Sequence, residues 1–410
     1  MKKLNKLYIS GITELNEKKR ILILSLLDIS MDNFCSMPFI HAMIDPNGYV
    51  QPCCSWDIEV DDKENDPWPN INEVGLQEAV QHKKFKDVRQ RMLNNHNVDG
   101  CRKCHWREKI HGYSFRTDRI YEKDKDWIKD NHSKLTADFH KLRYLETAFS
   151  SLCNLSCRMC GSFLSSTFHR ITKPGEKVKM NYIVPIEKYN VDLTNLTEIK
   201  IVGGEPLMEK KHDEFVDKLK GMPDNQLEMT YHTNCTMLPS KQVQEFWKRC
   251  KQITLHMSID SYAENNWHQR PGPYTWKDLL SVTDQFKKWS AEWGNIKLDI
   301  HATITKINVF HIHEMERWVD EYWEGTPGWF NYSVSCAHSP LPLSLASWRD
   351  NPERVKQVKD YLNTKVKREH IKEHVSSFFE YKERPLDYNK FIKEQTALDD
   401  YYGYEVNQWL

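Results

Sequence analysis

The chain of 410 residues has no excess of charge of either sign, because 58 lysines and arginines balance 58 aspartates and glutamates. Its overall charge therefore gives no indication of a nucleic-acid or anionic-membrane partner. The chain also has no early hydrophobic run of membrane length. The most apolar early stretch, 21–27, is too short to cross a bilayer, and no small-residue cleavage site follows it. We therefore expect a buried strand or helix there.

What the chain does contain is typical of a globular protein of two domains, with 28% charged and 39% hydrophobic residues. Its eleven cysteines are many for this length, and seven of them fall in tight clusters. Clustered cysteines in an intracellular chain indicate metal binding rather than disulfides. We expect a cytoplasmic, reducing and low-oxygen setting.

Three of these cysteines, Cys153, Cys157 and Cys160, have the spacing C-x-x-x-C-x-x-C after an extended run at 144–150. Three thiolates do not complete a tetrahedral zinc site, which needs four ligands. They suit a cubane iron–sulfur cluster in which one iron lacks a cysteine ligand and stays open to a small molecule. A loop of structural or zinc-binding cysteines is the alternative.

The triplet on a strand-to-helix loop resembles the signature of radical S-adenosylmethionine (SAM) enzymes, over about residues 140–340. The resemblance implies a 4Fe–4S cluster whose open iron chelates the amino and carboxylate groups of SAM. It also implies that one electron from the cluster cleaves SAM to a 5′-deoxyadenosyl radical, which abstracts hydrogen from a substrate. In such enzymes the protein supplies binding and orientation.

From residue 141 onward, strand-like and helix-like segments alternate, which predicts an α/β fold with a parallel sheet. The expected strands lie at about 143–150, 198–202, 227–233, 252–259, 296–304 and 330–336. Six such units imply, by the resemblance, a partial (β/α)6 barrel. Ligands of such sheets bind at the carboxyl ends of the strands.

Motifs at two strand ends resemble SAM-binding residues of the family. Gly203-Gly204-Glu205-Pro206 matches the motif that binds the SAM amino group, and glycines at a strand end permit close backbone approach. Thr233-Asn234-Cys235 stands where the family often has Thr-Asn-Gly, and a buried thiol is the expected role of Cys235.

Four further residues are expected around SAM by the same resemblance. Ser258 and Arg270 resemble the pair that contacts the SAM carboxylate, to which arginine offers a bidentate fork. Asp260 is expected to accept from the ribose hydroxyls, and Met159 to pack on adenine. The alternative for Arg270 is a simple ion pair with a surface acid.

Three residues are candidates on the substrate side. His256 and His301 each share a strand face with other polar residues by period-two alternation, and each is a candidate acid, base or donor. Cys336, near the end of the sixth strand, is a candidate hydrogen donor. Hydrogen-bonded core histidines and a buried, inert thiol are the alternatives.

Before this core, Asp45-Pro-Asn-Gly48 between two apolar runs predicts a β-hairpin, and helical periodicity follows over 76–93. The hairpin and a C-x-x-C pair bring together Cys35, Cys53, Cys101 and Cys104. A zinc ribbon is one reading. The spacing also resembles SPASM and twitch modules, which implies an auxiliary 4Fe–4S cluster. Cys54 is the alternative to Cys53 as ligand.

We therefore expect an auxiliary-cluster module at 1–125, a radical SAM barrel at 126–340 and charged amphipathic helices at 341–410. The expected activity is hydrogen abstraction from a peptide or protein side chain, with a flavodoxin or ferredoxin as reductant and no membrane partner. A dehydrogenase or epimerase of a sugar- or nucleotide-like small molecule is the second reading. A non-catalytic zinc-binding interaction protein is the third.

Overall fold

The computed structural model describes residues 32–57, 66–176, 185–325, 330–380 and 388–404. The segment at 21–27, predicted to be a buried strand or helix, lies outside the described residues. The chain divides into two compact units. The first contains the residues up to Glu146 together with Pro185–Thr197, and the second contains Thr147–Val184 and Glu198–Leu410.

The predicted hairpin is present in the first unit. Strands β1 (His41–Ile44) and β2 (Val50–Gln51) pair antiparallel. Gly48 adopts a left-handed φ of +82°, and its amide donates to the Asp45 carbonyl over 2.9 Å. The Asp45 carboxylate accepts from the amides of Asn47 and Tyr49, which closes the turn.

The first unit also contains seven short helices in its described residues: α2 (Met37–Ile40), α3 (Ile71–Val74), α4 (Leu76–Ala79), α5 (Lys83–Leu93), α6 (Arg102–His111), α7 (Phe115–Asp118) and α8 (Lys125–Asn131). The periodicity over 76–93 predicted one helix, and the structure corrects this to two, α4 and α5. His82 is extended and its ring accepts from the Lys84 amide, so it caps a new helix instead of continuing the old one.

The second unit contains a parallel sheet in sequential order. Strand β3 (Tyr144–Ala148) begins in the first unit and ends in the second, and it is followed by β4 (Glu198–Val202), β5 (Glu228–Thr233), β6 (Gln252–Met257), β7 (Ile296–Ile304) and β8 (Phe330–Cys336). Each neighbouring pair from β4 to β8 is parallel. The predicted α/β class with a parallel sheet of strand–helix units is confirmed.

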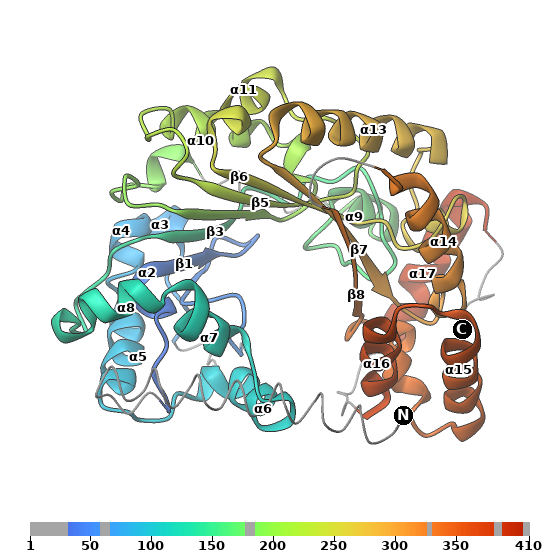
Figure 1. Ribbon diagram of the computed structural model, residues 1–410, viewed down its shortest axis with the longest axis horizontal. Coiled ribbons are helices and arrows are strands. Elements are labelled where there is room, and N and C mark those ends of the chain that lie inside the picture. The colour runs from blue at the N-terminus through green and yellow to red at the C-terminus, as the bar shows by residue number, and fades with distance from the viewer. Residues whose placement is uncertain (1–31, 58–65, 177–184, 326–329, 381–387, 405–410) are drawn as a thin grey trace. The chain divides into compact units, whose positions relative to one another are not determined.

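The helices of the second unit are α9 (Ser166–Thr172), α10 (Lys210–Lys218), α11 (Lys241–Arg249), α12 (Asn265–Gln269), α13 (Trp276–Trp293), α14 (Ile312–Trp323), α15 (Pro352–Lys365), α16 (Glu369–Ser377) and α17 (Tyr388–Tyr402). The predicted C-terminal helices are therefore present. Figure 1 shows α10, α11 and α13 along one face of the strands. None of the helices in the described ranges has the length and hydropathy that a bilayer crossing requires.

Alternate residues of the strands face opposite environments. On β5 and β6, Tyr231 and Leu255 are fully buried, and the Tyr231 hydroxyl accepts from Trp247 Nε1 of α11 over 3.0 Å. This contact identifies the face that packs on the helices. His232 and His256 belong to the other face, which remains partly open. We call this other face, over β4–β8, the polar face of the sheet.

Candidate active site

The three-cysteine loop lies between β3 and α9. Cys153 and Cys157 are buried and Cys160 is partly buried, and all three thiols are free. The thiols of Cys157 and Cys160 hydrogen-bond each other, and Cys153 interacts electrostatically with Cys157. Burial, followed by the nearby Cys157, raises the pKa of Cys153 to about 12. The three thiols therefore lie near enough to influence one another's ionisation, as the ligands of a shared cluster would.

Two side chains present N–H groups to these sulfurs. Arg270 Nη1 donates to Cys157 Sγ over 3.6 Å, and Asn234 Nδ2 donates to Cys153 Sγ over 3.9 Å. The hydrogen bond from Cys160, together with Arg270, lowers the pKa of Cys157. Donors aimed at sulfur stabilise thiolate, which is the form that binds metal. The donor set fits a cluster held by Cys153, Cys157 and Cys160.

The predicted glycine motif lies directly against this loop. The amide of Gly204 donates to the Ser150 carbonyl over 3.1 Å, and that of Glu205 donates to the Leu152 carbonyl over 2.7 Å. A Cβ on Gly204 would stand 2.1 Å from the Leu152 oxygen, so glycine is required there. The close approach to a ligand that the sequence predicted stays a prediction, and the structure shows close approach to the backbone that leads into Cys153.

Glu205 links this motif to the end of β5. Its buried carboxyl group accepts from Thr233 Oγ1 over 2.9 Å, from the Asn234 amide over 2.7 Å and from the Leu207 amide over 3.1 Å. Burial raises its pKa to about 7. These bonds fix Asn234 beside Cys153. Cys235 has a left-handed φ of +59° and is completely buried, so it occupies a backbone position that favours glycine.

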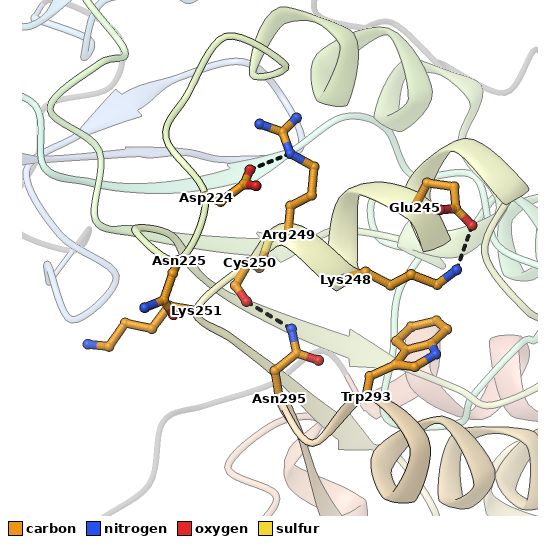
Figure 2. Close-up of a pocket in the computed structure, with 9 residues that line it drawn as sticks. All are labelled: Asp224, Asn225, Glu245, Lys248, Arg249, Cys250, Lys251, Trp293 and Asn295. Atoms are coloured by element: carbon orange, nitrogen blue, oxygen red, sulfur yellow. Dashed lines mark hydrogen bonds and ion pairs between the residues drawn. The ribbon is translucent and has the colours of Figure 1, made fainter.

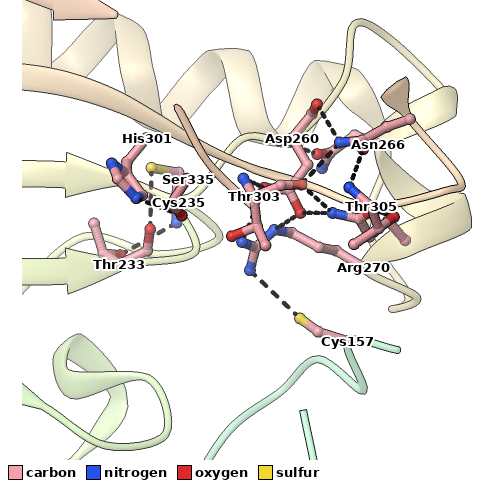
Figure 3. Close-up of polar contacts among 12 residues, drawn as sticks. Cys157, Thr233, Cys235, Asp260, Asn266, Arg270, His301, Thr303, Thr305 and Ser335 are labelled. Atoms are coloured by element: carbon pink, nitrogen blue, oxygen red, sulfur yellow. Dashed lines mark hydrogen bonds and ion pairs between the residues drawn. The ribbon is translucent and has the colours of Figure 1, made fainter. Parts of the chain in front are cut away.

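Arg270 forms a buried bidentate ion pair with Asp260. The two distances are 2.6 Å from Nε to Oδ2 and 3.0 Å from Nη2 to Oδ1. Asp260 also accepts from Gln269 Nε2 and from the Thr303 amide. Figure 3 shows Arg270 directed at both Asp260 and Cys157. The partner of Arg270 is thus a buried acid rather than a surface one.

The remaining expected SAM contacts are placed as follows. The Asp260 oxygens are engaged by protein donors, so its expected role toward ribose hydroxyls stays a prediction that nothing in its contacts supports. Ser258 is partly buried, and its amide donates to the Thr233 carbonyl over 2.8 Å. Met159 and Pro206 lie within the cysteine loop and the glycine motif respectively, with Met159 partly exposed.

The three candidate residues for the substrate side do not all lie on the same face of the sheet. His256 and His301 both lie on the polar face, where Asp299 Oδ2 stands 2.6 Å from His256 Nδ1 and 3.9 Å from His301 Nδ1. Cys336 lies on the opposite face and is 4% exposed. Burial raises its pKa to about 12. Its environment is that of an inert buried thiol, the alternative stated for it above.

Sequence reasoning missed Arg158, which stands between two of the cluster cysteines. Its guanidinium is buried, donates to the His268 carbonyl over 2.6 Å and to Gln395 Oε1 over 3.0 Å, and pairs with Asp399. Gln395 and Asp399 belong to α17. The C-terminal helix therefore holds the cluster loop, and no local motif marks this role.

In the first unit, the thiols of the four predicted auxiliary ligands interact with one another. The pKa of Cys53 is raised by burial and by the neighbouring thiols, and burial raises that of Cys101 to about 12. Burial likewise raises the pKa of Cys35, and the charge of Arg116 offsets a small part of the rise at Cys35 and Cys101. Cys54 is exposed. Four cysteines whose thiols influence one another fit a fully ligated iron–sulfur cluster.

A separate surface hollow of about 510 Å³ lies away from these motifs (Figure 2). Its lining residues Asn225, Lys251 and Asn295 precede β5, β6 and β7, so it lies at the amino ends of the strands. Arg249 in its wall is paired with Asp224. Because the cysteine loop and the glycine motif lie at the carboxyl ends, this hollow is not part of the candidate active site.

Comparison with known proteins bears on the identity of both units. Residues 147–334 match the family described as "Radical SAM superfamily", and residues 35–105 match "SPASM", an "Iron-sulfur cluster-binding domain". The GTP 3′,8-cyclase of Helicobacter pylori is 25% identical over 163 residues, which is 40% of this chain and 47% of that protein. The chain spans less than half the length of this relative.

Two solved structures resemble the chain weakly. The native anSMEcpe with bound AdoMet has a TM-score of 0.35 and 15% identity, with 54% of this chain and 59% of that chain covered. Streptococcus suis SuiB bound to precursor peptide SuiA has a TM-score of 0.33 and 16% identity, with 80% and 70% covered. Likenesses of this size say nothing about substrates. The two family matches agree with the clustered cysteines of each unit, and the chain belongs to the radical SAM superfamily, with an N-terminal SPASM iron–sulfur domain.

Proposed function

We propose that this radical SAM enzyme cleaves SAM reductively and abstracts hydrogen from a peptide or protein side chain. The observation that supports the activity is the proximity of Cys153, Cys157 and Cys160 to the glycine motif and Arg270. When bound, SAM at the open iron of a 4Fe–4S cluster supplies a 5′-deoxyadenosyl radical. The chain itself holds the cluster with three thiolates and orients their surroundings through Asn234 and Arg270.

The charged residues of the polar face favour a substrate whose bound group is uncharged, and they do not favour a nucleoside triphosphate. By alternation, its charged residues on the described strands are two lysines, Lys200 and Lys297, and three acids, Glu198, Glu228 and Asp299. Burial lowers the pKa values of His232 and His301, which keeps these rings neutral. A triphosphate requires an excess of cationic groups, and this face has none.

The activity is tested with anaerobically reconstituted protein, SAM and dithionite, with 5′-deoxyadenosine measured by mass spectrometry. We expect about eight irons per chain, from two cubane clusters. Changing Cys153, Cys157 and Cys160 together to alanine should leave about four irons and abolish 5′-deoxyadenosine formation. Cys250→Ala, which removes a buried thiol outside both clusters, is the control. Background iron with bound zinc would refute the enzyme reading in favour of a zinc-binding protein.

The substrate class is tested by incubating the active enzyme with SAM and cell extract and searching for species that change mass. Peptides that lose two hydrogens or gain a cross-link would support the proposal. The second candidate is a nucleotide-like small molecule, which is favoured by the match to GTP 3′,8-cyclases. Consumption of GTP in place of any peptide would establish that candidate.

A further inference from the structure

A hydrogen-bonded network on the polar face fixes the protonation of His256. Asp299 is 3% exposed at its side chain, and its Oδ2 lies 2.6 Å from His256 Nδ1. A carboxylate only accepts, so Nδ1 is the protonated nitrogen of His256. Every hydrogen bond that the described residues make to this ring goes to Nδ1. The basic nitrogen Nε2 is therefore left available on a side chain that is 28% exposed.

His301, the neighbour of His256, differs in this respect. Ser333 Oγ donates to both Asp299 oxygens, over 3.1 and 3.0 Å, so it acts as acceptor toward His301 Nδ1 at 2.8 Å. His301 Nε2 then accepts from Ser335 Oγ over 3.0 Å. Figure 3 shows His301 beside Ser335. Both nitrogens of His301 are engaged, although its side chain is 30% exposed, slightly more than the 28% of His256.

The same cluster could be read as a metal site, because ligand atoms of His256, Asp299 and His301 all lie within 4.8 Å of one another. The hydrogen bonds oppose this reading. Asp299 Oδ1 accepts from Asn331 and Ser333, and Oδ2 accepts from His256 and Ser333. Three donors, with the single Ser333 hydroxyl shared between both oxygens, thus occupy most of the roughly four lone-pair sites of the carboxylate, and a cation at Oδ2 would have to displace His256. The carboxylate therefore serves to orient His256 rather than to bind a cation.

The position of His256 also suits a role in the barrel. His232 of β5 is its register partner and stacks on its ring, with centroids 4.7 Å apart. On the neighbouring strand, the register partner of His256 is Asp299, which lies four residues before Thr303. The Thr303 amide donates to Asp260, the partner of Arg270. Four residues of a strand correspond to about 13 Å, so His256 lies two side-chain rows away from the groups around Cys157, on the same face of the sheet.

We propose that His256 accepts the proton of a substrate hydroxyl or thiol held against the polar face, with Asp299 as its positioning residue. In this step the O–H or S–H bond breaks and an N–H bond forms at Nε2. Asp299 offsets the charge of the resulting imidazolium. Such a buried acid, ordered imidazole and free nitrogen form the arrangement that general-base catalysis requires. The proposal rests on the proposed function, because it assumes a substrate in this barrel.

The availability of Nε2 is tested without a substrate, using diethyl pyrocarbonate, which reacts with the unprotonated nitrogen of a neutral imidazole. Brief anaerobic labelling of the holoenzyme is followed by peptide mapping. His301 is the internal control, because its exposure is nearly equal and both of its nitrogens are engaged. We expect His256 to react at least about fivefold faster than His301. Asp299→Asn, which lets Nδ1 lose its proton, should reduce the His256 rate to that of His301.

Equal rates for His256 and His301 in the wild type would overturn the proposal. Protection of both rings by one equivalent of Zn²⁺ would overturn it as well, because the cluster would then be a metal site.

The catalytic step is tested once a substrate is in hand. His256→Gln should retain 5′-deoxyadenosine formation while product formation falls about 10²-fold or more. Product formation within threefold of the wild type would refute the role of His256. If the wild type forms no 5′-deoxyadenosine, the proposed function fails instead, and the labelling result stands independently.

Discussion

The ion pair between Arg158 and Asp399 provides a sharp test of how the cluster loop is held. Both side chains are 2% exposed. Asp399→Ala would leave the guanidinium buried without its counter-charge, and removing one partner of a buried pair costs about 3–5 kcal/mol. Arg158 would keep its bonds to the His268 carbonyl and to Gln395. We therefore expect the lower end, a loss of about 3 kcal/mol in the free energy of unfolding.

For a unit of this size, about 1 kcal/mol corresponds to ~2–4 °C in the unfolding midpoint. Asp399→Ala should therefore lower the midpoint of the reconstituted protein by about 6–12 °C, measured anaerobically by circular dichroism. Asp360→Ala removes an exposed pair with Lys356 on α15 and should leave the midpoint unchanged. It is the matched control for loss of a carboxylate.

A second variant separates the charge from the packing. Arg158→Met combined with Asp399→Leu replaces the pair by apolar groups, which is often close to neutral in stability. We expect this double variant to recover most of the midpoint lost by Asp399→Ala. A shift below 2 °C for the single variant, or a double variant no more stable than the single one, would refute the view that α17 holds the loop through a buried charge.

Three further changes test other parts of the chain. Gly204→Ala should displace the backbone before the cysteine loop, so that iron analysis finds about four irons lost of about eight. Gly221→Ala is the control, because its added Cβ meets open space, and it should retain all of the iron. Cys53→Ala should also lose about four irons, while Cys54→Ala should lose none; the reverse result would make Cys54 the ligand. Burial lowers the pKa of His212 to about 3, so only the unfolded chain takes up a proton near pH 6.5, and stability falls with falling pH. Between pH 6.5 and 5 the wild type should lose about 1.6 kcal/mol more than His212→Gln in urea unfolding; equal losses would refute the buried, neutral assignment.

The strands of the second unit were predictable because apolar runs with a period of two end at distinctive residues. The predicted ranges 198–202, 296–304 and 330–336 coincide with β4, β7 and β8. The family motifs follow these runs, so their meeting at the carboxyl ends follows from parallel pairing. The prediction of one helix over 76–93 was wrong, because the apolar face continues through this range while the helical backbone is interrupted at His82. Periodicity reports which side chains are buried, and it does not report a cap formed by a histidine ring.

Contacts between distant segments set the limit of what sequence alone could predict. Arg158 is an unconstrained position in the spacing C-x-x-x-C-x-x-C, and 241 residues separate it from Asp399. No period or motif connects the two, and α17 has the pattern of an ordinary amphipathic helix. Once the pair is buried, however, neither residue is free to change alone, because each would leave a buried charge unmatched. The loop that carries the cluster ligands therefore depends on the last helix of the described chain, and a truncation before Tyr388 should reduce iron retention even though every cysteine remains.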